Sequence, residues 1–411
     1  MQTADRVQDG DAPGGVSRVV GHAYPWDVIG DPAFGDRVRA LGIREVTVAA
    51  SYHSARAATP LHPRHRVLEA PHAALYRPVR AEVWAGRSLR PVAGDWVTDG
   101  EETGGPDSSW DPFAQAAGTL LGQGFEVNAW LVLAHSTRLG TLRPDLAVRN
   151  CFGDSYSYAL CIAHEEVRDY VATLAAEATR DVPVNGVSIE GLGQMGVAHN
   201  GPHEKTDGAF GSAAQRVLSV CCCTACRIAW GEKGLDPHQT IARLREALAA
   251  AQNGNPAAGM SMPDLLGDTA EQLLATRLAH QDSTRLRVLA ALRGTAPHTR
   301  LTLHGQADPW ATGPSPAVTA TAAGDVDAIL VPAWGINEAS SDAIAAARRM
   351  APSSVSIAAY VSVLPPTELS AVPAHVAALV RSGADELHLY HLGLATRRQL
   401  DMLGTVAGSA Q

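Results

Sequence analysis

The sequence predicts an α/β fold, a (β/α)8 TIM barrel, over residues 17–408. Eight apolar strand-like segments follow one another along the chain, and nearly all of them precede an amphipathic helical segment. This alternation is typical of parallel strands joined by crossover helices. A doubly wound open sheet is the alternative, but no G-x-G-x-x-G motif follows the first strand, which argues against a dinucleotide-binding fold. The polar residues 1–16 predict a disordered lead.

The strands are expected where β-branched and aromatic residues gather between turn signals. Helical segments such as DPFAQAAGTLLGQG and ELSAVPAHVAALVRSG place apolar residues at helical spacing. Long loop insertions are expected after the second, third and fourth strands. In chain order, the predicted strands are Arg18–Trp26, Arg44–His53, Glu126–Ser136, Val184–Leu192, Arg300–Asp308, Asp327–Trp334, Ser354–Val363 and Asp385–Gly393.

Composition excludes several classes of partner. The formal net charge is −9 and the pI is about 6.0, with no cluster of Lys and Arg, so we expect no nucleic acid partner. No apolar run reaches the roughly 18 residues of a membrane helix, and the polar start has no apolar signal region. We therefore expect a cytoplasmic protein with reduced thiols. Exposed apolar side chains at the rim would be compatible with a homo-oligomer.

The functional site of such a barrel is expected at the carboxyl ends of the strands. Many residues there are aromatic or histidine where a purely structural end requires neither. Aromatic rings stack on the C–H faces of sugars, and His, Arg and Gln bind hydroxyl groups, so a carbohydrate ligand is expected. The predicted substrate-binding residues at these ends are His22, Trp26, Tyr52, His135, Arg138, His304, Trp334 and Tyr360.

Four of the six cysteines fall within six residues, in the segment CCCTAC. Cys221, Cys223 and Cys226 form a C-x-C-x-x-C pattern, whose spacing allows the thiolates to converge on one tetrahedral Zn²⁺. Cys161 or Cys151 could provide the fourth ligand. A redox C-x-x-C pair and buried unligated thiols are the alternatives, although a thioredoxin-like context is missing. A structural zinc site is the prediction.

The segments ALCIAHEEVRDYV, NGVSIEG and CCCTACRIAW resemble the first half of the barrel in family 42 β-galactosidases and their clan A relatives. The resemblance covers roughly residues 126–230. It implies that Cys161 joins the other three cysteines around the zinc, and that Glu190 is the acid/base residue of a glycosidase. It also extends to bacterial glycosidase-like barrel proteins with the same order of strand, glutamate and cysteine cluster.

The chain departs from that pattern at three points, one of which is a longer stretch between Glu190 and the cysteines, where a His-bearing loop is inserted. Family 42 has Asn-Glu at the acid/base site, whereas Ile189 precedes Glu190 here, and the seventh strand ends without a carboxylate. Glycosidases of the common types need a second carboxyl group. Asp308 and Asp27, just beyond the fifth and first strands, are the candidates, and each has a competing role as a turn or cap residue. Substrate assistance or Tyr360 as nucleophile would also supply the missing function.

The insertion VAHNGPHEK follows Glu190. Its residues His199 and His203 are four apart, but Gly201-Pro202 between them argues against the helix that a paired metal site would need. We expect these two histidines to contact the substrate from a loop that covers Glu190. A solvated loop is the alternative.

Three functions are consistent with these residues. The first is a glycoside hydrolase that uses Glu190 as general acid/base. The second is a sugar lyase or isomerase that uses His304, His135 or His22 as base. The third is a non-catalytic carbohydrate-binding barrel. The group that faces Glu190 distinguishes them, and the first is favoured.

Overall fold

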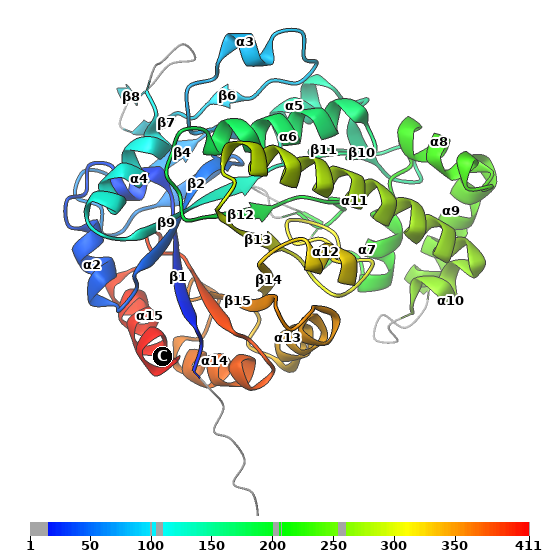
Figure 1. Cartoon of the computed structure of the whole chain (residues 1–411). Coiled ribbons are helices and arrows are strands. Elements are labelled where there is room, and N and C mark those ends of the chain that lie inside the picture. Colours follow the sequence, from blue (N-terminus) through cyan, green and yellow to red (C-terminus); the bar gives the residue numbers. More distant parts are fainter. Residues whose placement is uncertain are drawn as a thin grey trace, which may run out of the picture.

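The computed structural model describes residues 15–98, 101–103, 110–199, 205–206, 208–253 and 260–410. Eight parallel strands pair in the order β1-β16-β15-β14-β13-β12-β9-β2, and β2 pairs back onto β1, so the sheet closes on itself. Helices surround this closed sheet (Figure 1). The arrangement confirms the predicted (β/α)8 barrel.

All eight predicted strands are present, and each ends before its predicted last residue. The barrel strands are β1 (Arg18–Ala23), β2 (Glu45–Tyr52), β9 (Glu126–Val132), β12 (Gly186–Glu190), β13 (Arg300–His304), β14 (Ala328–Pro332), β15 (Ser356–Ser362) and β16 (Glu386–Tyr390).

At least one helix lies between each barrel strand and the next, and one closes the barrel after the last. The helices that directly precede the next strand, or close the barrel, are α2 (Phe34–Ala40), α4 (Pro112–Gly122), α6 (Glu165–Thr179), α11 (Asp268–Thr295), α12 (Ala320–Gly324), α13 (Glu338–Met350), α14 (Val372–Arg381) and α15 (Arg397–Ala410). Capping side chains set where several helices begin. Asp111 accepts from the Ala114 amide at the start of α4, and Asn337 accepts from the Ser340 amide at the start of α13.

The connection after β2 carries a small four-stranded antiparallel sheet and, separate from it, a pair of short strands of which one pairs with β2. Its elements are β3 (Ala55–Ala58), β4 (Val67–Ala70), β5 (Ala74–Leu75), α3 (Ala81–Trp84), β6 (Val92–Ala93), β7 (Trp96–Thr98) and β8 (Glu101–Thr103).

The connections after β9 and β12 form a second extension of the barrel, and α8, α9 and α10 lie to one side of the molecule (Figure 1). Its elements are α5 (Thr137–Leu142), β10 (Ala147–Arg149), β11 (Ser155–Leu160), α7 (Ser212–Leu218), α8 (Thr224–Glu232), α9 (Pro237–Asn253) and α10 (Met262–Leu266). Short α1 (Pro25–Val28) follows β1, and a single 3₁₀ turn (Leu369–Ala371) precedes α14.

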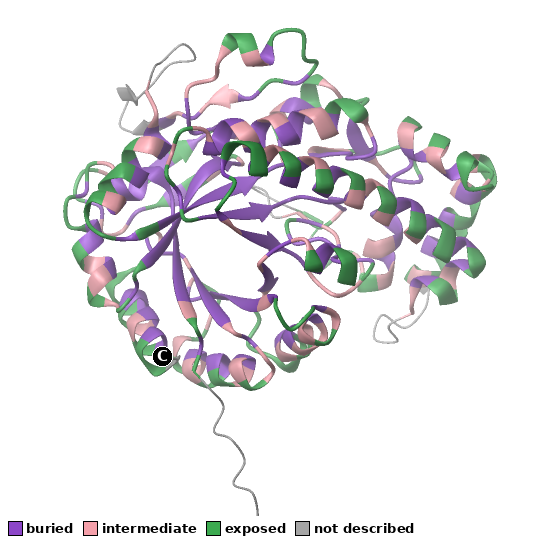
Figure 2. Ribbon diagram, viewed as in Figure 1, coloured by how far each residue is buried: buried purple, intermediate pink, exposed green. Residues whose placement is uncertain are grey.

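The barrel strands are buried and the outer faces of the helices are exposed (Figure 2). One large apolar core lies between strands and helices, and a second buried cluster lies in the extension around the cysteines. The predicted lead, residues 1–16, lies outside the described residues except for its last two. Val16 is buried in the main core. None of the described helices has the length and apolar character needed to cross a membrane.

Candidate active site

A cavity of about 370 Å³ opens at the carboxyl ends of the barrel strands. Its wall is mainly aromatic and imidazole side chains. A wider cavity of about 720 Å³ adjoins it and shares Tyr52, His53 and Tyr390 as lining residues. The first cavity is lined by Tyr52, His53, Trp130, His135, Glu190, Met195, Ala198, His199, Pro314, Trp334, Tyr360 and Tyr390.

Glu190 is the last residue of β12 and is the one carboxylate among the described residues that line this cavity. Its Oε2 accepts a 2.7 Å hydrogen bond from Nε1 of Trp130, and Nδ1 of His304 lies 3.6 Å from the same oxygen. Burial raises the pKa of Glu190 to about 7, and the Trp130 bond opposes that rise. A carboxyl group that is partly protonated near neutral pH can donate a proton.

Histidines form one side of the cavity. Nε2 of His135 lies 3.0 Å from Nε2 of His199, and the ring of His53 lies 4.7 Å from that of His135. The ring of His199 stacks on Tyr158 at 4.0 Å. Burial lowers the pKa of His53 to about 4, and burial together with His53 and His199 holds the pKa of His135 well below its usual range. These two imidazoles are therefore neutral at pH 7 and can both accept and donate hydrogen bonds.

Two predicted substrate-binding histidines lie beneath the cavity rather than on its wall. His22 and His304 are fully enclosed in the barrel interior. Tyr360 is one of the residues that line the cavity, and its hydroxyl group lies 3.2 Å from Nδ1 of His22. Nε2 of His304 lies 2.8 Å from the Ser188 hydroxyl group. Both histidines can reach a ligand only through groups that lie above them.

The two aspartates expected as a second carboxyl group have structural roles and do not line the cavity. Oδ1 of Asp308 accepts from the Trp310 amide at 2.9 Å, and its Oδ2 pairs with Arg216 at 2.6 Å. Asp27 is buried, and its Oδ2 accepts from the Tyr24 amide at 2.7 Å in a capping box. Burial raises the pKa of Asp27 to about 7. The described lining therefore lacks the usual pair of carboxylates.

Three other predicted substrate-binding residues are not among the described lining. Trp26 lies in the core, where its ring packs against Tyr76 and Trp96. Arg138 lies on α5, and its positive charge opposes the rise that burial causes in the pKa of Tyr170 on α6. His203 lies outside the described residues. By contrast, the predicted residues Tyr52, His135, His199, Trp334 and Tyr360 all line the cavity.

Trp130 and Tyr390 line the cavity but were not predicted. Both lie within strands rather than beyond them. Each also has the same parity, odd or even, along its strand as a residue whose side chain faces the barrel interior. Trp130 is two residues after Asn128, and Tyr390 is two residues after His388. Because alternate residues of a strand face the same side, this parity is the signal that would have identified them.

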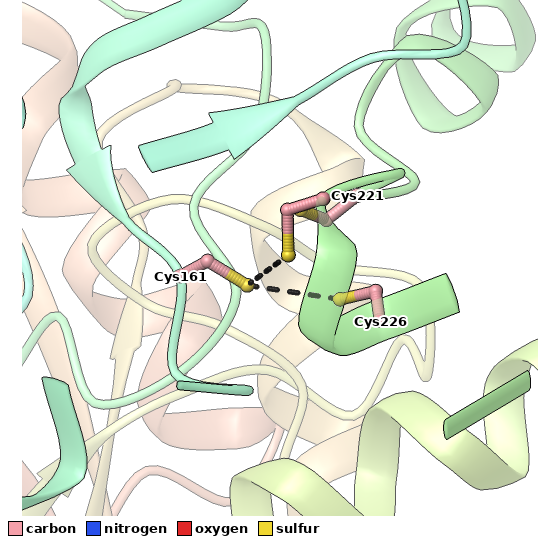
Figure 3. Close-up of side chains that lie close together, drawn as sticks. Cys161, Cys221 and Cys226 are labelled. Atoms are coloured by element: carbon pink, nitrogen blue, oxygen red, sulfur yellow. Dashed lines mark hydrogen bonds between the residues drawn. The ribbon is translucent and has the colours of Figure 1, made fainter. Parts of the chain in front are cut away.

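The four cysteines implied by the resemblance converge in the extension, beside the barrel. Their sulfur atoms lie within 4.8 Å of one another, and all four side chains are buried. Cys161, which follows β11, lies opposite Cys221 and Cys226 (Figure 3). Sγ of Cys161 is 3.7 Å from the sulfur atoms of both Cys223 and Cys226. The arrangement is close enough to bind a metal ion.

No protein-family model matches the chain, and no curated protein matches it either. Several solved structures share its fold. The catalytic domain of a β-amylase from Paenibacillus polymyxa matches with a TM-score of 0.58 at 11% identity, over 97% of this chain and 100% of that one.

Two longer proteins match as well. An α-L-fucosidase isoenzyme from Paenibacillus thiaminolyticus matches with a TM-score of 0.55 at 13% identity, over 95% of this chain and 49% of that one. A family 42 β-galactosidase from G. stearothermophilus matches with a TM-score of 0.53 at 11% identity, over 96% of this chain and 56% of that one. This chain thus spans about half the length of both. The similarity establishes the barrel fold of glycoside hydrolases, as the resemblance implied, and the fold alone.

Proposed function

We propose that this protein hydrolyses glycosidic bonds and that Glu190 is its general acid. The observation that carries the proposal is a buried carboxyl group on the cavity wall, with a pKa of about 7, at the carboxyl end of a barrel strand. The glycoside hydrolases that share the fold support the reaction class by analogy. The Trp130 bond orients the carboxyl group toward the cavity.

The lining favours a neutral carbohydrate. Tyr52, Tyr360 and the half-exposed Trp334 offer ring faces for stacking against sugar C–H groups. The neutral imidazoles of His53 and His135 supply hydrogen bonds without a fixed charge. The adjoining cavity behind Tyr52 and Tyr390 leaves room for a second sugar unit.

The cysteine cluster holds a structural Zn²⁺ in this proposal. A tetrahedral ion with Zn–S bonds of about 2.3 Å places its ligand sulfurs about 3.8 Å apart. The sulfur of Cys161 is 3.7 Å from those of both Cys223 and Cys226, which fits that geometry. With four thiolates the coordination is closed, so the ion would brace the extension after β9 and β12 and leave the chemistry to the barrel.

A histidine-based sugar lyase or isomerase is the second candidate function. It is favoured by the 3.0 Å contact between His135 and His199 on the cavity wall, since an imidazole that faces the substrate can act as a base.

The test is turnover of a panel of aryl glycosides and oligosaccharides by the wild type, Glu190→Gln and Glu126→Gln. Glu126 is the matched control because it lies at the opposite end of the barrel, with its side chain 54% exposed. Turnover that is lost in Glu190→Gln and kept in Glu126→Gln supports the hydrolase. Isomerised or eliminated products that do not depend on Glu190 favour the second function. No turnover of any sugar contradicts both, and sugar binding without turnover indicates a binding protein.

A further inference from the structure

Four buried polar side chains, which we call the file, contact one another in sequence from the cavity toward the other end of the barrel interior. They are Tyr360, His22, His388 and Glu386. The Tyr360 hydroxyl group lies 3.2 Å from Nδ1 of His22, and Nε2 of His22 lies 3.1 Å from Nδ1 of His388. Nε2 of His388 is 3.6 Å from Oε2 of Glu386, whose Oε1 pairs with Arg300. These residues belong to β15, β1, β16 and β13, so only closure of the barrel brings them together.

The carboxylate at the lower end sets the direction of every hydrogen bond in the file. Burial alone would raise the pKa of Glu386, but His388 and Arg300 hold it below its usual value, so the group is ionised and can only accept. Nε2 of His388 makes no hydrogen bond to any described residue, and Oε2 of Glu386, 3.6 Å away, is the negatively charged oxygen that lies near it. We assign His388 the tautomer with its single proton on Nε2, toward this carboxylate, and such a ring accepts at Nδ1.

The hydrogen bonds nearer the cavity have the same direction. Because Nδ1 of His388 accepts, Nε2 of His22 donates to it, and Nδ1 of His22 is left as an acceptor. The Tyr360 hydroxyl group then donates to that nitrogen. Burial, followed by the neighbouring histidines, holds the pKa of His22 well below its usual range, so this ring is neutral at rest. Burial, followed by Glu190, holds the pKa of Tyr360 well above its usual value, so the phenol keeps its proton until its oxygen bonds to the substrate.

Resting on the proposed function, we infer that Tyr360 is the catalytic nucleophile and that His22, oriented by His388 and Glu386, is its general base. A buried phenol is a weak nucleophile unless an adjacent base removes its proton. Tyr360 and Glu190 both line the cavity, and three strand-to-strand steps separate β12 from β15 around the barrel. The two groups can therefore act on a sugar from different sides.

In the first step, the phenol oxygen of Tyr360 bonds to the anomeric carbon, and the bond from that carbon to the leaving oxygen breaks. Glu190 gives its proton to the leaving oxygen, and the phenol proton passes to Nδ1 of His22. The imidazolium so formed is stabilised by Glu386 through His388. In the second step, Glu190 takes a proton from water, the water oxygen bonds to the anomeric carbon, and the Tyr360 oxygen departs and recovers its proton from His22. Two displacements give retention of configuration.

The closing experiment has three readouts. The first is the anomeric configuration of the initial product, followed by NMR, with retention expected. The second is mass spectrometry of peptides after reaction with a 2-deoxy-2-fluoro glycoside, with the adduct expected on Tyr360. The third needs no turnover: ¹⁵N NMR of histidine-labelled protein should show His22 protonated at Nε2 and unprotonated at Nδ1.

Variants sharpen these readouts. Tyr360→Phe should lower kcat on the order of 10⁴-fold and abolish the adduct, and Glu386→Gln should lower kcat on the order of 10²–10⁴-fold by disturbing the tautomers. Tyr76→Phe is the matched control, because this core phenol has no partner in the described structure. The inference is overturned by inversion, by an adduct on another residue, or by His22 protonated at Nδ1. Inversion with dependence on Glu190 would leave the proposed function standing, whereas no sugar turnover at all would remove both.

Discussion

Nε1 of Trp130 donates a 2.7 Å hydrogen bond to Oε2 of Glu190, so a side chain of the third barrel strand affects the ionisation of the carboxyl group on the fourth. The bond favours the charged form and opposes the effect of burial on the pKa. This one contact between neighbouring strands connects the packing of the barrel to the pH range in which its proposed acid works.

Trp130→Phe should move the basic limb of the pH–rate profile to higher pH. A general acid must be protonated, so turnover falls as the pH rises through the pKa of Glu190, which lies at about 7. Loss of the bond raises that pKa further, so the basic limb should move up by about one pH unit. Trp84→Phe is the control, because the buried Nε1 of Trp84 has no partner in the described structure. An unmoved or acid-shifted limb would contradict this role of Trp130.

Glu190→Gln should stabilise the folded protein at alkaline pH. Burial raises the pKa of Glu190 from 4.5 to about 7, so its contribution to stability is present below pH 4.5 and is lost as the pH rises through 7. Glutamine keeps an acceptor for Trp130 and carries no charge. Urea titrations should show a gain on the order of 1–3 kcal/mol near pH 8 and almost none near pH 4. An equal gain at both values would contradict the raised pKa.

Removal of metal should lower the melting temperature and should not directly stop turnover. Closed thiolate sites contribute folding energy, so a strong chelator or Cys161→Ser should lower Tm by roughly 10 °C. Cys151→Ser is the matched control, since Cys151 is buried nearby but lies outside the four-sulfur cluster. Elemental analysis of the purified protein should find one zinc per chain. Melting that is indifferent to the chelator would refute a structural metal.

Asp308→Asn should keep kcat within about twofold of the wild type. Asparagine can still accept from the Trp310 amide, and the lost ion pair with Arg216 is about one-third exposed on both sides. Such pairs contribute about 0–1 kcal/mol to folding. Steady-state kinetics on the best substrate from the panel measures the effect. A loss on the order of 10²-fold or more would return Asp308 to the candidate catalytic residues.

The sequence alone determined the fold. Strand-like segments, and the helices after nearly all of them, are local patterns, and each predicted strand overlaps an observed one. It also identified the four converging cysteines, because the spacing of Cys221, Cys223 and Cys226 is local and the resemblance supplied Cys161. The sequence also predicted Glu190 at the carboxyl end of a strand, and it is the last residue of β12.

Only the tertiary structure decided which strand-end residues share the cavity. Trp26 and Trp334 both follow strands, yet Trp26 packs in the core and Trp334 is 48% exposed at the cavity. Likewise, the contact from His22 to His388 joins residues 366 positions apart, and the Trp130 bond to Glu190 joins residues 60 apart. Period and propensity act over a few residues, whereas strand register and barrel closure set which side chains meet inside the barrel.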